Sequence, residues 1–182
     1  VVLTHAAASF ADKQVGSGKQ ITASGLAIAS ASASGIPVYG YQLASTTTSG
    51  SIGQITPKAL TVSGISVANK AYDGTTGATV DTSNAIYNGL IANDEFSVSA
   101  TAAFSDKNVG AGKMVALSSI YGGQDAGNYS ITDQSGTTAD ITPKAVTVSG
   151  ISAANKVYDG TTSATVDTAN AVFSGLIAND VV

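Results

Sequence analysis

The stretch that decides the fold of this chain covers residues 55–94 and reads ITPKALTVSGISVANKAYDGTTGATVDTSNAIYNGLIAND. It returns at residues 141–180 as ITPKAVTVSGISAANKVYDGTTSATVDTANAVFSGLIAND, an offset of 86 residues (141 − 55). A second related pair, FADKQVGSGK at residues 10–19 and FSDKNVGAGK at residues 104–113, has an offset of 94 residues (104 − 10). Because self-similarity at a fixed period indicates tandem repeats, the domain organisation follows from the repeat.

The joint Ile-Thr-Pro-Lys occurs twice, at residues 55–58 and 141–144. Proline cannot donate to a β-ladder and favours an edge or a linker, so we take this joint as the domain boundary. The chain then divides into the C-terminal half of a preceding repeat (1–56), a complete repeat (57–142) and the N-terminal half of a following repeat (143–182). Half-domains carry unpaired strand edges, so we expect them to be completed by neighbouring repeats of the same chain or by identical subunits in a filament.

Apolar residues alternate with a period of two, as a half-buried β-strand requires. Residues 95–104 place five apolar side chains on one face: Phe96, Val98, Ala100, Ala102 and Phe104. We predict further strands at residues 59–67, 75–80, 85–91, 113–121, 128–132 and 137–142, with Gly-containing turns between them. No stretch predicts a helix of useful length.

About seven short strands per 86 residues favour an all-β fold of tandem small antiparallel β-sandwiches, immunoglobulin-like and of Greek-key type. The repeats are about 86–94 residues long. A β-helix or solenoid is the alternative fold. It needs a coil repeat of roughly 20 residues, and no such sub-period is present within the unit.

The composition excludes several classes of function. The net charge is −4 and all eight basic residues are lysines, which argues against a nucleic-acid partner because phosphate neutralisation needs clustered Lys and Arg. No apolar run approaches the roughly 20 residues of a membrane span, so we expect no membrane insertion. With no Cys, one His and no phosphate-binding loop, we expect no catalytic residues and no enzyme activity.

The motif Lys-x-Tyr-Asp-Gly-Thr-Thr occurs at residues 70–76 and again at residues 156–162. We interpret its centre as a structural hairpin turn, in which Gly tolerates positive φ, Asp accepts turn N–H groups and Tyr packs on the core. The turn residues are Tyr72, Asp73 and Gly74 in the first copy and Tyr158, Asp159 and Gly160 in the second. The alternative is a ligand site, with Tyr stacking on a sugar and Asp binding its hydroxyls.

Asp94, Glu95 and Asp125 are the candidate metal ligands, because their hard oxygens suit calcium and calcium often rigidifies extracellular repeat arrays. Against this site, the chain has no Asp-x-Asp-x-Asp loop, and the next copy has valine in place of Glu95. We therefore expect no cofactor, with calcium as the one candidate ion. Asp12 and Lys13 are interpreted as an ion pair beside a turn.

Four motifs together resemble the YDG-type repeats of bacterial exoproteins. They are the two Tyr-Asp-Gly motifs, the Phe-x-Asp-Lys-x-Val-Gly-x-Gly-Lys stretches, Asp-Ala-Gly-Asn-Tyr at residues 125–129 and the Ile-Thr-Pro-Lys joints. The first sequence copy departs from the pattern: it lacks Asp-Ala-Gly-Asn-Tyr and has Val-Tyr-Gly-Tyr at residues 38–41, inside a longer loop. Such repeats stand in long arrays in filamentous-haemagglutinin-like adhesins of two-partner secretion systems. The resemblance implies an extracellular location at a bacterial cell surface.

We therefore expect a structural protein: a stalk or fibre segment of a secreted adhesin or biofilm-matrix filament, which gives reach and mechanical continuity because repeats pack on their neighbours. The alternative is an adhesive module that binds a receptor or host or matrix glycans through Tyr39, Tyr41, Tyr121 and Tyr129. Exposed aromatic side chains in the longer loop would favour binding. Buried tyrosines would favour the spacer.

Overall fold

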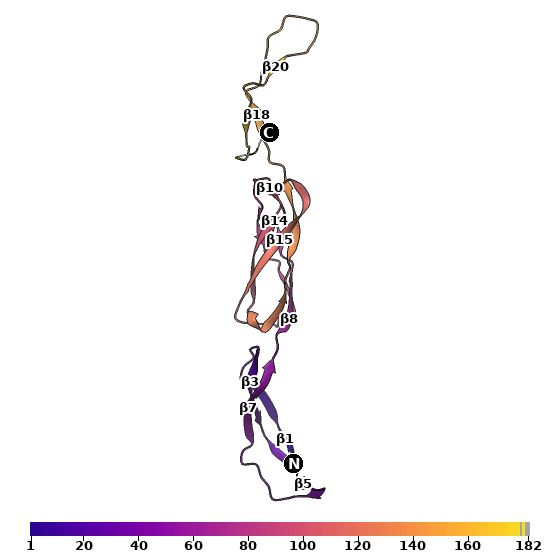
Figure 1. Ribbon diagram of the computed structural model, residues 1–182, viewed down its shortest axis with the longest axis vertical. Helices are drawn as coiled ribbons and strands as arrows, with labels where there is room; N and C mark the ends of the chain where they lie inside the picture. Colours follow the sequence, from indigo (N-terminus) through magenta and orange to yellow (C-terminus); the bar gives the residue numbers. More distant parts are fainter. Residues whose placement is uncertain (179, 181–182) are drawn as a thin grey trace. The chain divides into compact units, whose positions relative to one another are not determined.

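The structure is a computed structural model that describes residues 1–178 and residue 180 (Figure 1). Residues 179, 181 and 182 of the predicted half-repeat at 143–182 lie outside the described residues. Residue 181 is the valine that replaces Glu95 in the next copy. The described residues form β-strands and one 3-10 turn, η1, at Ala126–Asn128, and the all-β prediction is confirmed. Among them, no helix has the length and apolar character needed to cross a bilayer.

The chain divides into two compact units. Unit 1 comprises Val1–Val62, Tyr87–Val98 and Tyr121–Asp133, and unit 2 comprises Ser63–Ile86, Ser99–Ile120 and Gln134–Val182. Each unit is described by itself.

Unit 1 holds the sheets β1-β4, β2-β3-β7, β5-β6 and β13-β8-β16. The strands are β1 Val2–Thr4, β2 Ala7–Phe10, β3 Gly16–Ser24, β4 Ala27–Ser30, β5 Ser32–Ala33, β6 Ile36–Pro37, β7 Thr47–Ile55, β8 Lys58–Ser63, β13 Ile86–Asn88 and β16 Tyr129–Thr132. In the three-stranded sheet β2-β3-β7, β3 is central and both neighbours are antiparallel to it. In β13-β8-β16, β16 runs parallel to β8.

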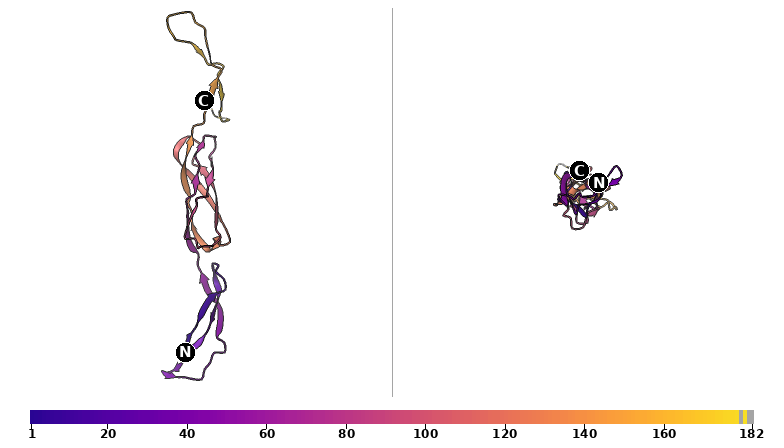
Figure 2. Two further views of the ribbon diagram at one scale, coloured as in Figure 1. Left: turned by 180° about the vertical axis from the view of Figure 1, so that it is seen from behind. Right: turned by 90° about the horizontal axis from the view of Figure 1, so that it is seen from below.

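Unit 2 is organised around the five-stranded sheet β10-β17-β15-β14-β11, which curls into a nearly closed, barrel-like form (Figures 1 and 2). Its strands are β10 Lys70–Ala71, β11 Gly77–Ala78, β14 Ser97–Phe104, β15 Gly110–Gly122 and β17 Gly136–Thr142. Six shorter strands form the two-stranded sheets β12-β9, β18-β21 and β19-β20. These are β9 Ser66–Val67, β12 Val80–Asp81, β18 Thr147–Ser149, β19 Ser152–Ala153, β20 Val166–Asp167 and β21 Val172–Ser174.

The core of unit 2 consists of Phe104, Val115, Ala139 and Ile141, each at most 5% exposed. Its strands alternate as the sequence predicts, because Val115 is buried while its neighbours along β15 are exposed. Four partly buried residues pack against this cluster: Val67, Tyr72, Ala78 and Ala102. With one large ring and otherwise small side chains, the core is thin.

Unit 1 buries Leu60 and Val62 of β8, at 1% and 2% exposure, and places three tyrosine rings around Phe96. The centroids of Tyr87, Tyr121 and Tyr129 lie 5.1, 5.7 and 6.1 Å from that of Phe96. Edge-to-face and offset-stacked pairs at such distances stabilise a core beyond the area they bury.

Two features of the fold differ from the antiparallel sandwich expected from the sequence. The main sheet curls on itself, and a pair of facing sheets is not confirmed. In addition, β8 pairs with β16 and β10 pairs with β17 in parallel. Each parallel pair joins residues 71 apart in the sequence (129 − 58 and 141 − 70), and a connection of that length frees the strands from the antiparallel geometry that a hairpin imposes.

The predicted strands are largely found, with shifted ends. The stretch 59–67 is divided into β8 and β9 at Gly64, whose φ of +79° interrupts the strand. The stretch 75–80 is likewise divided into β11 and β12. The stretches predicted at 95–104, 113–121, 128–132 and 137–142 correspond to β14, β15, β16 and β17, and the stretch at 85–91 contains the shorter β13.

Candidate functional site

The turn at Tyr72-Asp73-Gly74 is fastened by a lysine. Asp73 Oδ1 accepts hydrogen bonds from the backbone N–H and the hydroxyl of Thr75, both at 2.9 Å, and from Lys70 Nζ at 2.8 Å. The same ammonium donates to the carbonyl oxygens of Thr75 and Gly77, at 2.9 and 2.8 Å. Lys70, followed by Thr75, lowers the pKa of Asp73 to about 2. Gly74 takes the positive φ of +79° expected of it.

The second copy repeats this turn. Lys156 Nζ lies 2.9 Å from Asp159 Oδ1, which also accepts from the N–H and hydroxyl of Thr161 at 3.0 Å. Lys156 lowers the pKa of Asp159. Tyr158, by contrast, is 93% exposed, whereas Tyr72 is partly buried against the core of unit 2.

The first turn is not the hairpin that the sequence suggested. β10 and β11, which flank Asp73-Gly74, do not pair with each other but form the two opposite edges of the five-stranded sheet. The turn therefore crosses from one edge of the sheet to the other. This crossing connection brings the edges together because only five residues, 72–76, separate the two strands.

Unit 1 contains a lysine held between two carboxylates. Lys13 Nζ lies 3.0 Å from Asp94 Oδ1 and 2.8 Å from Asp125 Oδ1. Both aspartate side chains are nearly buried, at 11% and 8% exposure, while that of Lys13 is 64% exposed. Asp125 and then Asp94 raise the pKa of Lys13, and Lys13 is the main cause that lowers the pKa of Asp125. The ammonium thus offsets two carboxylates that have lost most of their water.

Backbone groups and a tyrosine orient these carboxylates. Asp125 Oδ2 accepts the backbone N–H of Glu95 at 3.0 Å, and Asp94 Oδ2 accepts the hydroxyl of Tyr129 at 2.5 Å. Burial, followed by this bond to Asp94, raises the pKa of Tyr129. Beside the lysine, the backbone N–H of Val15 donates to Asn128 Oδ1 at 2.9 Å.

The calcium candidates are therefore only partly brought together. Asp94 and Asp125 share one site, where the ammonium of Lys13 lies between them. Glu95 reaches this site through its backbone, as the donor to Asp125. Within residues 1–178 and 180, no group of three or more His, Cys, Asp or Glu side chains could hold a metal ion. This carboxylate pair, as arranged, fits an ammonium better than calcium.

Unit 2 contains the sequence counterpart of this pair. Lys107, 94 residues after Lys13, lies with its Nζ 3.8 Å from Oδ1 of Asp180, which is 86 residues after Asp94. The same Asp180 oxygen accepts the hydroxyl of Tyr72 at 3.1 Å, and Lys107 Nζ lies 5.9 Å from the centre of the Tyr72 ring. Tyr72, and after it Asp180, raise the pKa of Lys107.

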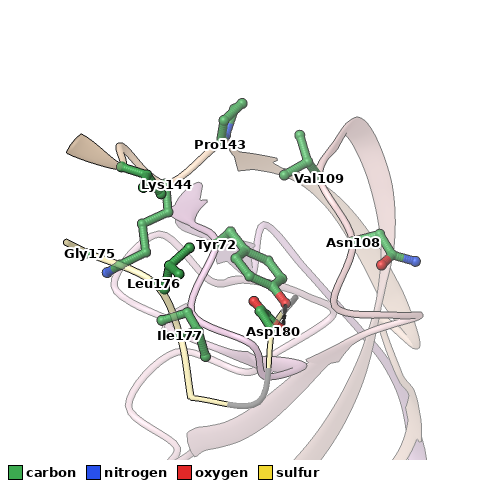
Figure 3. Close-up of a pocket in the computed structure, with 10 residues that line it drawn as sticks. Tyr72, Asn108, Val109, Pro143, Lys144, Gly175, Leu176, Ile177 and Asp180 are labelled. Carbon is green, nitrogen blue, oxygen red and sulfur yellow. Dashed lines mark hydrogen bonds between the residues drawn. The ribbon is translucent and has the colours of Figure 1, made fainter. Parts of the chain in front are cut away.

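A cavity of about 380 Å³ lies beside this second pair. Figure 3 shows the hydroxyl of Tyr72 bonded to Asp180, with Leu176 and Ile177 beside them and Val109 and Pro143 across the cavity. The cavity is lined mainly by apolar side chains from either side of the second Ile-Thr-Pro-Lys joint.

The sequence interpretation missed the role of Lys13. Asp12 pairs with Lys19 instead, and its counterpart Asp106 pairs with Lys113 at 2.6 Å. The predicted Asp12–Lys13 pair is therefore wrong, because the turn points the two neighbouring side chains to different partners. One available signal was that Lys13 and Asp94 both recur in the second copy, as Lys107 and Asp180.

These features define a class: an all-β repeat protein whose repeated side chains form turns and ion pairs. The YDG domain family model matches residues 56–138 and matches again at residues 142–182. The chain belongs to the YDG domain family. Neither the comparison with curated proteins nor the comparison with solved structures finds a match.

Proposed function

We propose that the chain is a structural spacer, the stalk or fibre segment of a secreted bacterial adhesin or biofilm-matrix filament. The observation that carries this proposal is the recurrence of the Lys13–Asp94 pair as Lys107–Asp180. In each pair the lysine precedes an Ile-Thr-Pro-Lys joint and the aspartate follows it. The pairs thus link residues of consecutive sequence copies, as an array that transmits force from repeat to repeat requires.

In each of these ion pairs the aspartate also accepts a hydrogen bond from a tyrosine. In unit 1, Asp94 is bonded by Tyr129, which follows it in the same copy. In unit 2, Asp180 is bonded by Tyr72, which precedes it in the earlier copy. We propose that in a longer array the aspartate at each of these positions accepts hydrogen bonds from two tyrosines, one in its own copy and one in the preceding copy.

We also propose that a complete repeat is a small antiparallel β-sandwich. In this proposal residues 1–56 are the C-terminal half of a preceding repeat, residues 57–142 a complete repeat and residues 143–182 the N-terminal half of a following one. The resemblance of the motifs to filamentous-haemagglutinin-like exoproteins supports an extracellular location and two-partner secretion. The residue inventory, with no Cys and a single His, supports a role other than catalysis.

The role of the ion pairs of Lys13 with Asp94 and Asp125 can be tested by measuring the spread of distances between two labelled positions of unit 1. The chain has no cysteine, so spin labels at Ser51→Cys and Ser130→Cys, two exposed positions of unit 1, are site-specific. We expect a narrow distance distribution by pulsed electron paramagnetic resonance in the parent chain. Lys13→Met should broaden it, because the two aspartates then repel each other, and Lys13→Arg should preserve it.

Lys144→Met is the matched control, since Lys144 forms no ion pair with any described residue. It should leave the distribution unchanged. An equally narrow distance distribution in the Lys13→Met chain would show that the ion pairs of Lys13 do not fix the arrangement of unit 1. The spacer proposal would then lose its main support.

An adhesive module is the second candidate function, and one observation favours it. Tyr39 and Tyr41, in the longer loop of the first copy, are 87% and 72% exposed and line an open cavity of about 490 Å³. In contrast, Tyr129 is 7% exposed and Tyr121 stacks on Phe96, as expected of core residues. Exposed aromatic rings separated by one residue could stack on a sugar.

Binding to a glycan array distinguishes the two functions. If the loop is adhesive, the parent chain should bind defined glycans and the Tyr39→Ala/Tyr41→Ala variant should lose that binding. Tyr158→Ala is the matched control, because Tyr158 is also exposed but lies in the other unit. Absence of binding by the parent chain would leave the spacer as the supported function.

A further inference from the structure

Asn88 is the only asparagine in the sequence that is followed by glycine. It is the last residue of β13 and is exposed on unit 1. Among the described residues, no hydrogen bond holds its side-chain amide. Asparagine is a thermolabile residue, and glycine after it favours reaction with the backbone, because without a Cβ the next nitrogen approaches the side-chain carbonyl carbon freely.

Gly89 supplies the attacking nitrogen. It lies just beyond β13 with a φ of +105°, and its N–H takes part in none of the backbone hydrogen bonds of the described turns and loops. A side chain at this position would clash with the carbonyl oxygen of Ala59, so the turn requires glycine. Both reacting groups are thus free of other partners among the described residues.

The corresponding turn of the next copy shows that the asparagine itself is not required. Ser174-Gly175 stands there in place of Asn88-Gly89, and Gly175 has a φ of +98°. A Cβ at Gly175 would likewise approach the carbonyl oxygen of Ala145 closely. The side chain of serine has no carbonyl carbon, so it cannot undergo this reaction. The turn therefore depends on its glycine and tolerates a residue other than asparagine before it.

The two Tyr-Asp-Gly motifs contain the other sequences prone to this cyclisation, since aspartate followed by glycine reacts in the same way. In both motifs the structure holds the carboxylate. Asp73 Oδ1 accepts a hydrogen bond from Lys70 at 2.8 Å, and the second copy has the same bond from Lys156 at 2.9 Å. An ammonium at this distance keeps a carboxylate ionised, and an ionised carboxylate is a poor electrophile because it cannot release water.

We propose that Asn88 is a site of spontaneous covalent modification, at which the chain deamidates through a cyclic imide, while the lysines of the two Tyr-Asp-Gly motifs keep their aspartates out of the same reaction. The Gly89 nitrogen loses its proton and bonds to Cγ of Asn88, the Cγ–Nδ2 bond breaks, and Nδ2 leaves as ammonia. Water then opens the ring. Hydrolysis at Cγ gives aspartate, and hydrolysis at the main-chain carbonyl carbon gives isoaspartate.

The isoaspartate product would lengthen the main chain where there is little room. It adds a carbon atom to the backbone directly before Gly89, where even a Cβ would clash with Ala59. Shortly afterwards the backbone N–H of Ile91 donates to the hydroxyl of Tyr129 at 3.0 Å, and this hydroxyl donates to Asp94. We therefore expect the isoaspartate form to unfold at a lower temperature than the parent. The proposal does not depend on the spacer function.

Ageing the parent chain beside an Asn88→Ser chain tests the site. Both are kept at mildly alkaline pH and physiological temperature, then digested and analysed by mass spectrometry with fragmentation that separates aspartate from isoaspartate. Asn88 should lose its amide faster than every other asparagine and give both products. The serine variant copies the turn at Ser174 and should fold without this modification. If Asn88 reacts no faster than Asn84, which is exposed but followed by alanine, the proposal is wrong.

Incubation at mildly acidic pH, where free aspartates isomerise, tests the lysines. The folded parent should form no isoaspartate at Asp73 or Asp159, whereas the parent unfolded in urea should form it at both. Lys70→Gln should release Asp73 alone, with Asp159 as the control within the same chain and circular dichroism to verify folding. Isomerisation of Asp73 in the folded parent at the rate of the unfolded chain would refute the protection. An Asn88→Asp chain that unfolds like the parent, beside an aged chain that unfolds earlier, would assign the destabilisation to the added backbone atom; equal unfolding of all three would contradict it.

Discussion

Ile65 and its sequence counterpart Ile151 differ in burial, and replacing each of them separately by alanine should change the free energy of unfolding by different amounts. Ile65 is 2% exposed and its counterpart Ile151 is 52% exposed. Ile65→Ala removes three carbon groups at about 0.8 kcal/mol each, or about 2.4 kcal/mol, and the cavity left behind adds to this loss. We expect a destabilisation of about 3 kcal/mol. Because half of the Ile151 side chain is already in water, Ile151→Ala should cost about 1 kcal/mol or less.

Thermal unfolding followed by circular dichroism provides the measurement. For a repeat of this size, each kcal/mol lowers Tm by about 4–8 °C, so Ile65→Ala should lower the main transition by about 12–24 °C. Ile151→Ala should move it by only a few degrees. Hydrogen exchange of the β8 and β9 peptides should rise in the first variant only. Equal losses in both variants would refute the assignment of Ile65 to a buried core that Ile151 lacks.

Three further perturbations test the turns and the close backbone contacts. Gln134→Leu removes the side chain that accepts the N–H and donates to the carbonyl of Ile65, at 3.0 and 2.7 Å, so unfolding should become easier by about 1–3 kcal/mol in denaturant titrations. Because the pKa of Asp73 is lowered to about 2, its contribution to stability is fully present above about pH 4 and is lost as the pH falls toward 2. The Asp73→Asn chain should therefore lose less stability than the parent over that interval in acid titrations followed by circular dichroism. Gly123→Ala should lower Tm by several degrees, since its φ is +104° and a Cβ there would clash with the backbone oxygen of Glu95. Gly127→Ala, with no atom within 4 Å of its Cβ, should not.

The local elements of this fold could be predicted from the sequence because their signal is local. Alternation within a strand such as β14 depends on side chains two residues apart, and one open and one buried face suffice to produce it. The hydrogen bonds of the Asp73 turn are local for the same reason, since the donors Lys70 and Thr75 lie within three residues of the Asp73 carboxylate. Strand partners could not be predicted in this way, because Lys70 pairs with a residue 71 positions later (141 − 70).

The candidate site shows the same limit. Asp94 and Asp125 could be identified as hard oxygen ligands, but the cation between them comes from Lys13, which lies 81 residues before Asp94. Nothing in the neighbourhood of Lys13 points to that partner, and the adjacent Asp12 suggested a different one. The repeat carried the only usable signal, since a lysine and an aspartate retained at corresponding positions are candidates for a contact.

The parallel pairing of β10 with β17 determines how the central copy would respond to tension applied along the chain. β17 ends inside the second Ile-Thr-Pro-Lys joint, with Ile141 and Thr142 as its last two residues, so tension along the chain would be applied at its C-terminal end. Drawn along its axis, β17 must slide past β10 and β15 together, and their hydrogen bonds then share the load in shear instead of opening one after another. The lifetime of the strand under tension is a rate set by this concerted rupture, and equilibrium stability alone does not determine it.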